Sequence, residues 1–436
     1  MHAPTHENTT FGNQSISVGV VGCGYWGPNL IRNLSNMPNC TLRAVCDRSI
    51  ERLNHMTSLY PGVEGTTEFD HMLNGMNIDA VVVATPVKYH YPLAKAALLA
   101  GKHVFIEKPM ASSVAQCEEL IELADEKGLT LMVGHTFLYS EPVRKICEII
   151  ESGAIGDIRY INSQRLNLGL FQQDINVAWD LAPHDISIIL HLLKDNPDTV
   201  NCQGKAHITP GIQDVTNISL DFGGKRFATI QSSWLEPRKV RQMTIVGTKK
   251  MIVYNDLEPH DKIRVYDTRV DRDGLEEEVE EHTIDAETKP PHYDTFGEFQ
   301  YSYHYGGSTV PHIRQSEPLR VEMDHFLECI STGMMPLSSG QQGLEMVRIL
   351  EATSLSLNAA GSPVRLSEMP QKKNSTENGT KTDARPTNGG EQGGRPTNNG
   401  SLLANGVSPT NGSRQNGSSD SPTNGNRPTK VLQNTK

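Results

Sequence analysis

The chain has 436 residues and a formal net charge of −11, so it is long enough for two domains of ordinary size. From Gln371 to Lys436 it has no aromatic residue, repeats the triplet P-T-N, and holds nine Lys/Arg against four Asp/Glu. This segment therefore carries +5 (nine minus four), and the rest of the chain about −16 (−11 minus +5). An acidic body argues against nucleic acid as the main partner.

The two ends of the chain differ from its body. Residues 1–14 and 366–436 are polar and poor in apolar side chains, so they cannot bury enough surface to offset the entropy lost on ordering. Both segments are predicted to be disordered. The hydrophobic patterns that indicate folded domains lie between them.

Several features that would indicate other compartments or a metal centre are missing. The sequence has no stretch of about 18 apolar residues, the length needed to span a membrane. Its first residues lack the apolar segment of a signal peptide. The seven cysteines are scattered, without a C-x-x-C pair, which favours reduced thiols over disulfides or a zinc site. We therefore expect a cytoplasmic protein with no membrane span and no metal.

Residues 16–27 combine a strand, a glycine-rich turn and the start of a helix. The apolar run I-S-V-G-V-V is followed by G-C-G-Y-W-G. In a dinucleotide site, the first glycine of such a motif permits a tight turn, the second lets a pyrophosphate approach, and the third lets helix pack on strand. The predicted cofactor contacts in this turn are Gly22, Gly24, Tyr25, Trp26 and Gly27.

An acidic residue stands where a dinucleotide site needs one. The second predicted strand, T-L-R-A-V-C, ends at Asp47, 20 residues after Gly27. A carboxylate there accepts hydrogen bonds from the adenosine ribose and repels a 2′-phosphate. NAD is therefore the favoured cofactor, although the neighbouring Arg48 is also compatible with NADP.

Strands and helices continue to alternate up to residue 140. Strands are predicted at 79–86, 102–109 and 129–133 with helices between them, which indicates a doubly wound parallel sheet whose ligands lie at the carboxyl ends of the strands. Polar groups and turn residues gather at those ends. They are Thr85, Pro86, Glu107, Lys108, Gly134 and His135, with His90 close behind the first of them as a further predicted cofactor contact.

Together, the glycine-rich turn, the strand ending A-T-P and the stretch A-G-K-H-V-F-I-E-K-P resemble the glucose–fructose oxidoreductase/inositol dehydrogenase (Gfo/Idh/MocA) family. The resemblance extends over residues 15–362. It implies a Rossmann domain at 15–140 that binds NAD or NADP. It also implies that Lys108 lies beside the nicotinamide and the substrate hydroxyl, that Glu107 and Lys108 contact the nicotinamide ribose, and that the Lys108–Pro109 peptide is cis.

From residue 141 the pattern changes. After a helix at 143–152, successive strands are joined by turns such as G-G-K and G-T-K-K, which predicts a largely antiparallel, open-faced sheet in an α+β domain at 141–365. Amphipathic helices follow at 318–360, and the acidic run within 270–300 is interpreted as solvated surface. One face of the sheet needs a cover from helices or from another subunit. The resemblance implies a homodimer or homotetramer formed through that face.

The segment W-D-L-A-P-H-D-I places Asp180 and His184 four residues apart, on one face of a helix. Because Pro183 is tolerated best in a first turn, the helix is predicted to begin near Asp180 or Leu181. Asp180 is then either a helix cap or part of a working pair with His184. Asp185 is interpreted as a first-turn charge.

Oxidation of a sugar alcohol requires a base for the hydroxyl proton and a donor for the developing oxyanion. His184 suits the first role and Lys108 the second, with Asp180 orienting the imidazole and accepting a hydrogen bond from substrate. Family members carry an Asp and a His at this spacing, which supports the same roles. Four cations on or beside the predicted strands are either ligands of a nucleotide diphosphate or solvated strand-end charges: Arg165, Arg238, Lys239 and Arg241. Tyr305 is predicted to line the site.

The stretches G-H-T-F-L-Y-S and S-Q-R-L-N-L-G-L-F-Q resemble the subset of this family that acts in nucleotide-sugar and surface-polysaccharide pathways. The leading hypothesis is an NAD-dependent dehydrogenase that oxidises C3 of a UDP-N-acetylhexosamine or its uronic acid. The alternatives are a keto-sugar reductase, a dehydrogenase of a free sugar or inositol, and a cofactor-binding sensor without turnover. An intact set of Lys108, Asp180 and His184 argues against the sensor.

Overall fold

The computed structural model describes residues 15–224, 226–272 and 301–369. The predicted disorder of residues 1–14 and of the tail from residue 370 onward lies outside these ranges, as does most of the acidic run after residue 270. Within them, no helix has both the length and the apolar character needed to cross a lipid bilayer.

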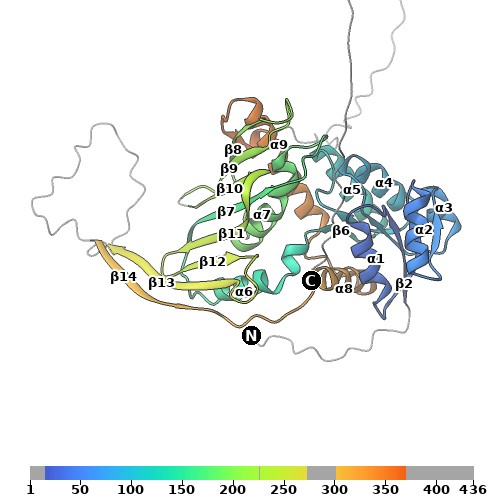
Figure 1. The fold of residues 1–436 in the computed structure, drawn as a ribbon, viewed down its shortest axis with the longest axis horizontal. Coiled ribbons are helices and arrows are strands. Elements are labelled where there is room, and N and C mark those ends of the chain that lie inside the picture. Colours follow the sequence, from blue (N-terminus) through green and yellow to red (C-terminus); the bar gives the residue numbers. More distant parts are fainter. Residues whose placement is uncertain (1–14, 225, 273–300, 370–436) are drawn as a thin grey trace, which may run out of the picture. The chain divides into compact units, whose positions relative to one another are not determined.

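The first sheet has six parallel strands in the order β3-β2-β1-β4-β5-β6, which confirms the predicted doubly wound sheet (Figure 1). The short edge strand β3 was not predicted. The order reverses between β1 and β4, and in such sheets ligands bind outside the carboxyl ends of the strands at this point. The strands are β1 (Ile16–Val21), β2 (Cys40–Cys46), β3 (Glu64–Thr66), β4 (Ala80–Val83), β5 (His103–Glu107) and β6 (Leu131–Gly134).

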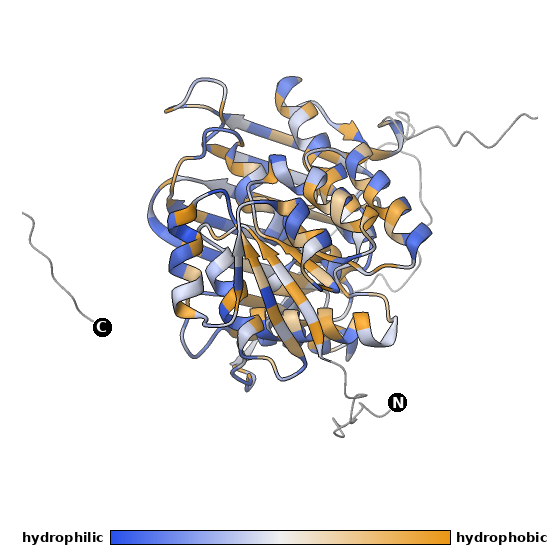
Figure 2. Cartoon of the chain, turned by 90° about the vertical axis from the view of Figure 1, so that its right-hand side faces the viewer, coloured by the Kyte–Doolittle hydropathy of each residue, from blue (hydrophilic) through white to orange (hydrophobic). Residues whose placement is uncertain are grey.

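Helices flank this sheet and bury its strands. All four residues of β4 and of β6 are buried, as expected for parallel strands covered on both faces, and apolar residues colour much of the central strands in Figure 2. Ser49 and Ser113 cap two of the helices by accepting hydrogen bonds from Arg52 N and Gln116 N. The helices are α1 (Gly27–Ser35), α2 (Ile50–Leu59), α3 (Phe69–Gly75), α4 (His90–Leu99) and α5 (Val114–Lys127).

The second sheet has nine strands in the order β14-β13-β12-β11-β7-β10-β9-β8-β15. Every neighbouring pair is antiparallel except β7 with β10, so the predicted largely antiparallel sheet is confirmed. The strands are β7 (Ile158–Leu168), β8 (Thr199–Lys205), β9 (Val215–Asp221), β10 (Phe227–Ser233), β11 (Leu235–Gly247), β12 (Met251–Asn255), β13 (Ile263–Arg272), β14 (Tyr301–Thr309) and β15 (Val364–Arg365).

Three helices cover one face of this sheet: α6 (Glu141–Glu151), α7 (Val177–Leu193) and α9 (Gly340–Asn358). Their apolar side chains and those of the strands form one core, which includes Ile161, Ile189 and Ile349. Elsewhere on the sheet, Tyr160 and Phe227 stack with ring centroids 5.5 Å apart and remain exposed.

After β14 the chain returns to the first domain. Helix α8 (Pro318–Thr332) packs against α1 and joins the core beneath β1 and β5, where Phe326 meets the edge of Phe105 with centroids 5.7 Å apart. The predicted apolar stripe of this helix is confirmed as core. Beyond residue 365 a short 3-10 helix (Leu366–Glu368) follows, and Leu366 and Met369 are buried in the core of the second sheet. The prediction that the disordered tail begins at residue 366 is therefore wrong for residues 366–369.

Candidate active site

The glycine-rich turn is shaped by steric demands. Gly22 has φ +102°, and a Cβ there would lie 2.4 Å from the carbonyl oxygen of Ala84. A Cβ on Gly27 would lie 1.9 Å from the carbonyl oxygen of Gly22. At Gly24, by contrast, the nearest atom is 3.8 Å away, so this backbone is open to a ligand. The turn therefore fits a pyrophosphate at the N-terminus of α1.

Asp47, at the end of β2, is held in place by the backbone. Its Oδ2 accepts a hydrogen bond from Cys23 N at 2.7 Å, and its Oδ1 accepts one from Ser49 N at 2.9 Å. Each oxygen keeps a second lone pair for a ribose hydroxyl. A cavity of about 920 Å³ lies beside it and includes Gly24 and Arg48 in its lining, and the Arg48 guanidinium donates to the Tyr89 hydroxyl at 3.3 Å. This arrangement fits the adenosine half of NAD.

Two buried polar atoms at the carboxyl edge of the first sheet, Thr85 Oγ1 and Glu107 Oε1, have no hydrogen-bond partner among the described residues. Burial raises the pKa of Glu107 to about 7, against the lowering effects of the Lys108 charge and a hydrogen bond from Trp26. Unpaired buried groups need a ligand or water as partner. Their position fits the hydroxyls of a nicotinamide ribose.

The other predicted cofactor contacts differ in exposure. Tyr25 is 91% exposed and Trp26 37% exposed, both in the turn before α1. His90 is buried, with Nδ1 2.8 Å from the carbonyl oxygen of Pro109 and Nε2 2.7 Å from that of Thr85. The His90 ring thus lies beneath the site and links the segments that follow two strands, β4 and β5. Pro86 leads from the end of β4 into the short helix Val87–Tyr89.

Lys108 reaches across to the second domain. Its Nζ donates a hydrogen bond to the carbonyl oxygen of Asp180 at 2.9 Å, and the Lys108–Pro109 peptide is cis. Burial lowers the pKa of Lys108, and the neighbouring charges of Asp180 and Glu107 oppose that shift. An ammonium group in this position can donate to a substrate oxygen as well as to the helix.

The prediction that α7 begins near Asp180 is wrong. The helix begins at Val177, because Asn176 caps it by accepting a hydrogen bond from Trp179 N at 3.1 Å. Pro183 therefore lies in the second turn. Because Pro183 has no N–H, the carbonyl of Trp179 lacks the hydrogen bond that the residue four positions later normally donates. Lys108 donates a hydrogen bond to the carbonyl of the next residue, Asp180.

Asp180 and His184 occupy the same stretch of α7 but contact different groups. Asp180 Oδ2 accepts a hydrogen bond from Trp234 Nε1 at 3.1 Å. The His184 ring packs against the edge of Phe137, with centroids 5.1 Å apart at 68°. Among the described residues, no hydrogen bond joins the Asp180 and His184 side chains. Asp180 is thus fixed by an indole rather than by the imidazole.

The surroundings of His184 favour its neutral form. Burial lowers its pKa well below 6.5, and the positive charges of Lys108, Arg165 and Arg241 lower it further. A smaller contribution comes from His135. At neutral pH the imidazole is unprotonated and can accept a proton.

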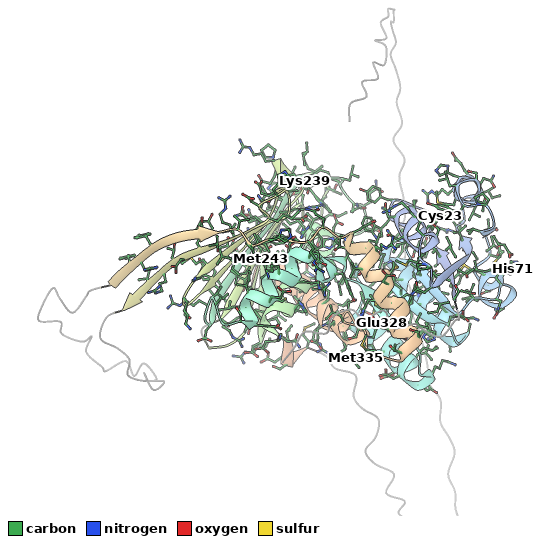
Figure 3. All side chains as sticks on the ribbon, turned by 90° about the horizontal axis from the view of Figure 1, so that it is seen from below. Cys23, His71, Lys239, Met243, Glu328 and Met335 are labelled. Atoms are coloured by element: carbon green, nitrogen blue, oxygen red, sulfur yellow. The ribbon has the colours of Figure 1, made fainter. Side chains whose placement is uncertain are left out.

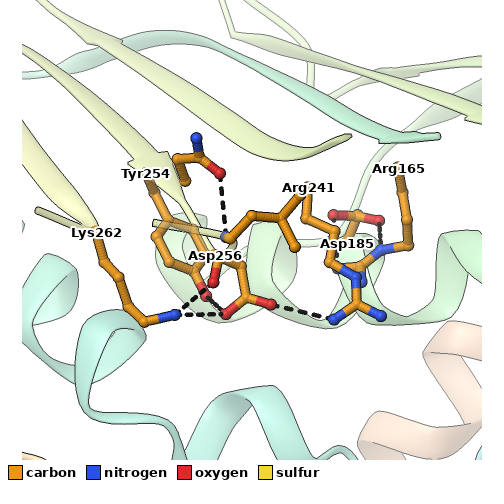
Figure 4. Close-up of polar contacts among 8 residues, drawn as sticks. Arg165, Asp185, Arg241, Tyr254, Asp256 and Lys262 are labelled. Atoms are coloured by element: carbon orange, nitrogen blue, oxygen red, sulfur yellow. Dashed lines mark hydrogen bonds and ion pairs between the residues drawn. The ribbon is translucent and has the colours of Figure 1, made fainter. Parts of the chain in front are cut away.

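Arg165 lies close to His184, but its charge is already paired. Its Nε donates to Asp185 Oδ2 at 2.6 Å in a buried ion pair (Figure 4), and the other oxygen of Asp185 accepts from Ser163 Oγ. The interpretation of Asp185 as a first-turn charge is therefore wrong: it lies in the third turn and neutralises a buried arginine. A second pair, Arg241 with Asp256 at 3.2 Å, lies beside the first.

Arg238 and Tyr305 lie apart from this cluster. Arg238 is exposed where the pairing of β11 with β7 is interrupted, next to Lys239 (Figure 3). Tyr305 is 78% exposed on the edge strand β14, four strands away from β7 in the sheet order, and stacks on Tyr303. The structure does not bring Tyr305 to Lys108.

Two residues of the site were not among the predicted contacts. His135 follows β6 directly, is buried, and has an Nε2 without a hydrogen-bond partner among the described residues. Glu322 of α8 is fully buried and accepts from Thr136 Oγ1 at 2.7 Å. Burial and the charge of Glu107 raise the pKa of Glu322 well above 4.5. The position of His135 at a strand end was a usable signal, whereas Glu322 gave none.

Comparison with known families decides the affiliation. Residues 16–135 match the family described as "Oxidoreductase family, NAD-binding Rossmann fold" (GFO_IDH_MocA), and residues 143–253 match the "GFO/IDH/MocA C-terminal domain". The chain belongs to the Gfo/Idh/MocA family. Its first domain is thus a NAD-binding Rossmann domain, and the expected family is confirmed.

Relatives within the family carry several functional names. An uncharacterized oxidoreductase of Bacillus subtilis, YrbE, is 25% identical, with 81% of this chain and 97% of that protein covered. A 2,7-anhydro-N-acetylneuraminate hydratase of Escherichia coli is 29% identical, with 57% and 70% covered. The structure of a UDP-N-acetylglucosamine 3-dehydrogenase from Acidithiobacillus ferrooxidans superposes with a TM-score of 0.63 at 21% identity, covering 79% and 99%. At that identity the last match shows the fold alone.

Proposed function

We propose that this Gfo/Idh/MocA protein is a sugar dehydrogenase that oxidises a secondary alcohol to a ketone with NAD, with a nucleotide sugar as substrate. The observation that carries the proposal is the bond from Lys108 to the turn of α7 that bears Asp180 and His184. It brings a cation and a neutral imidazole to the strand ends where Thr85 and Glu107 offer unpaired atoms to a ribose.

Each group has a task in the proposed reaction. NAD, when bound, accepts the hydride. His184 takes the proton of the substrate hydroxyl, and its lowered pKa keeps it available for that step. Lys108 donates to the substrate oxygen and stabilises the negative charge that develops on it. Asp180, held by Trp234, accepts a hydrogen bond from a neighbouring substrate hydroxyl.

We further propose a UDP-linked N-acetylhexosamine, or its uronic acid, as substrate, oxidised at C3. Arg238 and Lys239 are exposed on β11, four and five residues after Trp234, and could meet a diphosphate there. Arg165 suits this role less well, because Asp185 already neutralises its guanidinium. The name of the structurally similar UDP-N-acetylglucosamine 3-dehydrogenase agrees with this choice.

A second candidate is a reaction without net oxidation. The relative named as a hydratase is 29% identical to this chain, and the same residues could remove a hydride and later return it to the sugar. Such a reaction would consume substrate without accumulating NADH.

The test is to incubate the full chain with NAD and panels of UDP-sugars, free sugars and inositols, following both the nicotinamide absorbance and the sugar products. NADH formation with UDP-N-acetylhexosamines alone would support the proposal. NADH formation with free polyols alone would exclude a nucleotide sugar as the substrate. Formation of a sugar product without NADH would support the second candidate, a reaction without net oxidation. His184→Asn should abolish turnover, whereas His191→Gln, two turns along α7, should not.

We also propose a homodimer or homotetramer formed through the open face of the second sheet. The stacked, exposed Tyr160 and Phe227 are the apolar groups that such an interface would cover. Sedimentation of the full chain with and without Phe227→Lys tests this, since an unchanged sedimentation coefficient would exclude these residues from the contact.

A further inference from the structure

His135 is a buried imidazole to which the proposed reaction gives no task. Its side chain is 2% exposed, and Nε2 has no hydrogen-bond partner among the described residues. Leaving such a group unpaired destabilises the folded state. A fold keeps an unsatisfied group of this kind where a water molecule or a function compensates for it.

A cavity of about 350 Å³ has this histidine in its lining. Its walls come from α7, from the residues that follow α7, and from α9, and they include Ser187, His191, Lys194, Gln342 and Glu345. Gln342 Oε1 is a second buried atom without a partner among the described residues. With these polar groups in its wall, a cavity of this size has room for several water molecules.

His135 is also close to His184. Phe137, two residues after His135, contacts the His184 ring, and Ser187, in the cavity wall, donates to the His184 carbonyl at 2.8 Å. Burial lowers the pKa of both histidines, that of His135 to about 4, and the charge of Lys108 lowers both further. His135 itself also acts on His184. The two rings are therefore close enough for the charge on one to affect the protonation of the other.

The proposed function creates a need for such a neighbour. When the alcohol is oxidised, its carbon loses a hydride with two electrons to the nicotinamide, and the hydroxyl proton goes to His184. The imidazolium must lose that proton before the next turnover. A route from His184 to solvent that does not pass through the substrate would allow this loss.

We propose that His135 and the water-filled cavity behind it carry this proton from His184 to solvent. His135 accepts a proton on one ring nitrogen and releases one from the other to cavity water, so that its charge and protonation state are restored in each cycle. This inference rests on the proposed function. His135 is then a relay residue that acts through His184 and has no contact with substrate.

The first test is His135→Gln in the full-length protein, with the substrate found in the NAD assay. Because proton release follows hydride transfer, kcat should fall roughly tenfold while kcat/KM stays unchanged. The solvent deuterium isotope effect on kcat should rise, and added imidazole should restore activity. His71→Gln, which alters an exposed imidazole on α3 outside this cavity, should change none of these. A fall in kcat without an isotope effect or rescue would show a merely structural role and overturn the proposal.

The second test needs no turnover. With ¹⁵N-labelled histidine in the full chain, the ring N–H of His135 should exchange with water quickly, whereas that of His90, clamped between two carbonyls, should exchange slowly. Equal, slow exchange at both would exclude the water path. Fast exchange together with no substrate in the panel would leave the path intact and reject the proposed function.

Discussion

Charged side chains have different uses in the two sheets. In the parallel sheet, the ionisable residues Asp47, Glu107 and Lys108 stand at the carboxyl ends of strands, where we propose that the cofactor binds. In the nine-stranded sheet, the charged residues nearest the site are Arg165 and Arg241. Each forms an ion pair, Arg165 with Asp185 and Arg241 with Asp256.

This difference shows how topology divides the work. Parallel strands deliver all their ends to one edge, so a polar residue there meets the ligand. Antiparallel strands run past the site, so a charge between sheet and helix must find an internal partner. We therefore expect substitutions at the first edge to affect turnover and substitutions in the buried pairs to affect stability.

The largest effect is expected for Lys108→Met. Loss of the donor to the developing oxyanion should lower kcat about a thousandfold, equal to about 4 kcal/mol of barrier, with little change in the unfolding midpoint. Steady-state kinetics and urea unfolding measure the two effects. Lys102→Met is the matched control, because Lys102 binds the Ile78 carbonyl just before the start of β5 and should leave kcat unchanged. Equal losses in both variants would contradict the assigned role.

A buried pair of the second sheet should respond in the opposite way. Asp185→Asn leaves Arg165 buried without a counter-charge, which should cost about 3 kcal/mol of unfolding free energy in urea titrations. Asp261→Asn breaks an exposed pair with Arg264 and should cost less than about 1 kcal/mol. If Asp185→Asn abolished turnover at full stability, the pair would belong to the active site.

Glu322 combines features of both groups of residues, because it is buried on helix α8 and lies close to Glu107. Its raised pKa means that the folded state keeps a proton that the unfolded state loses above pH 4.5, so wild-type stability falls as pH rises from there. Glu322→Gln removes this loss and should be more stable than wild type by about 1 kcal/mol at pH 8, with a smaller gain at pH 5. Thermal unfolding at both values tests this, with the exposed Glu328→Gln on the same helix (Figure 3) as control.

The smallest effect concerns the acidic limb of kcat/KM. Because the pKa of His184 lies well below 6.5, activity should be level near neutrality and fall only at lower pH. Removing a nearby positive charge with Arg241→Met favours the protonated ring, so the limb should move to higher pH. Lys262→Met is the control, because Lys262 shares Asp256 with Arg241 but is absent from the charges that act most on His184. An unmoved limb would show that another group titrates.

The same division explains what could be predicted from sequence. Thr85, Glu107 and Lys108 were identifiable because a βα repeat fixes where strand ends meet. The start of α7 was not, since Asn176 and Asp180 are both acceptable caps and local sequence does not choose between them. The fate of Arg165 depended on a helix partner, Asp185, whose orientation toward the sheet follows only from packing. Glu322 lies on α8, far from β6 in the sequence. The sequence of α8 is that of an ordinary amphipathic helix, so it did not indicate that Glu322 belongs to the site.

Helix α8 has a consequence for the order in which the chain is made. Leu319, Met323 and Phe326 fill the same core as Val18 and Leu30, and Glu317 binds Arg32 at the start of the helix. The dinucleotide domain is encoded first, yet it lacks this part of its own interior until residue 332 has left the ribosome. During synthesis the apolar side chains beside α1 stay uncovered while strands β7 to β14 of the second sheet are being translated. The newborn protein is therefore expected to rely on chaperones most heavily in that interval, and to gain a complete cofactor domain only near the end of translation.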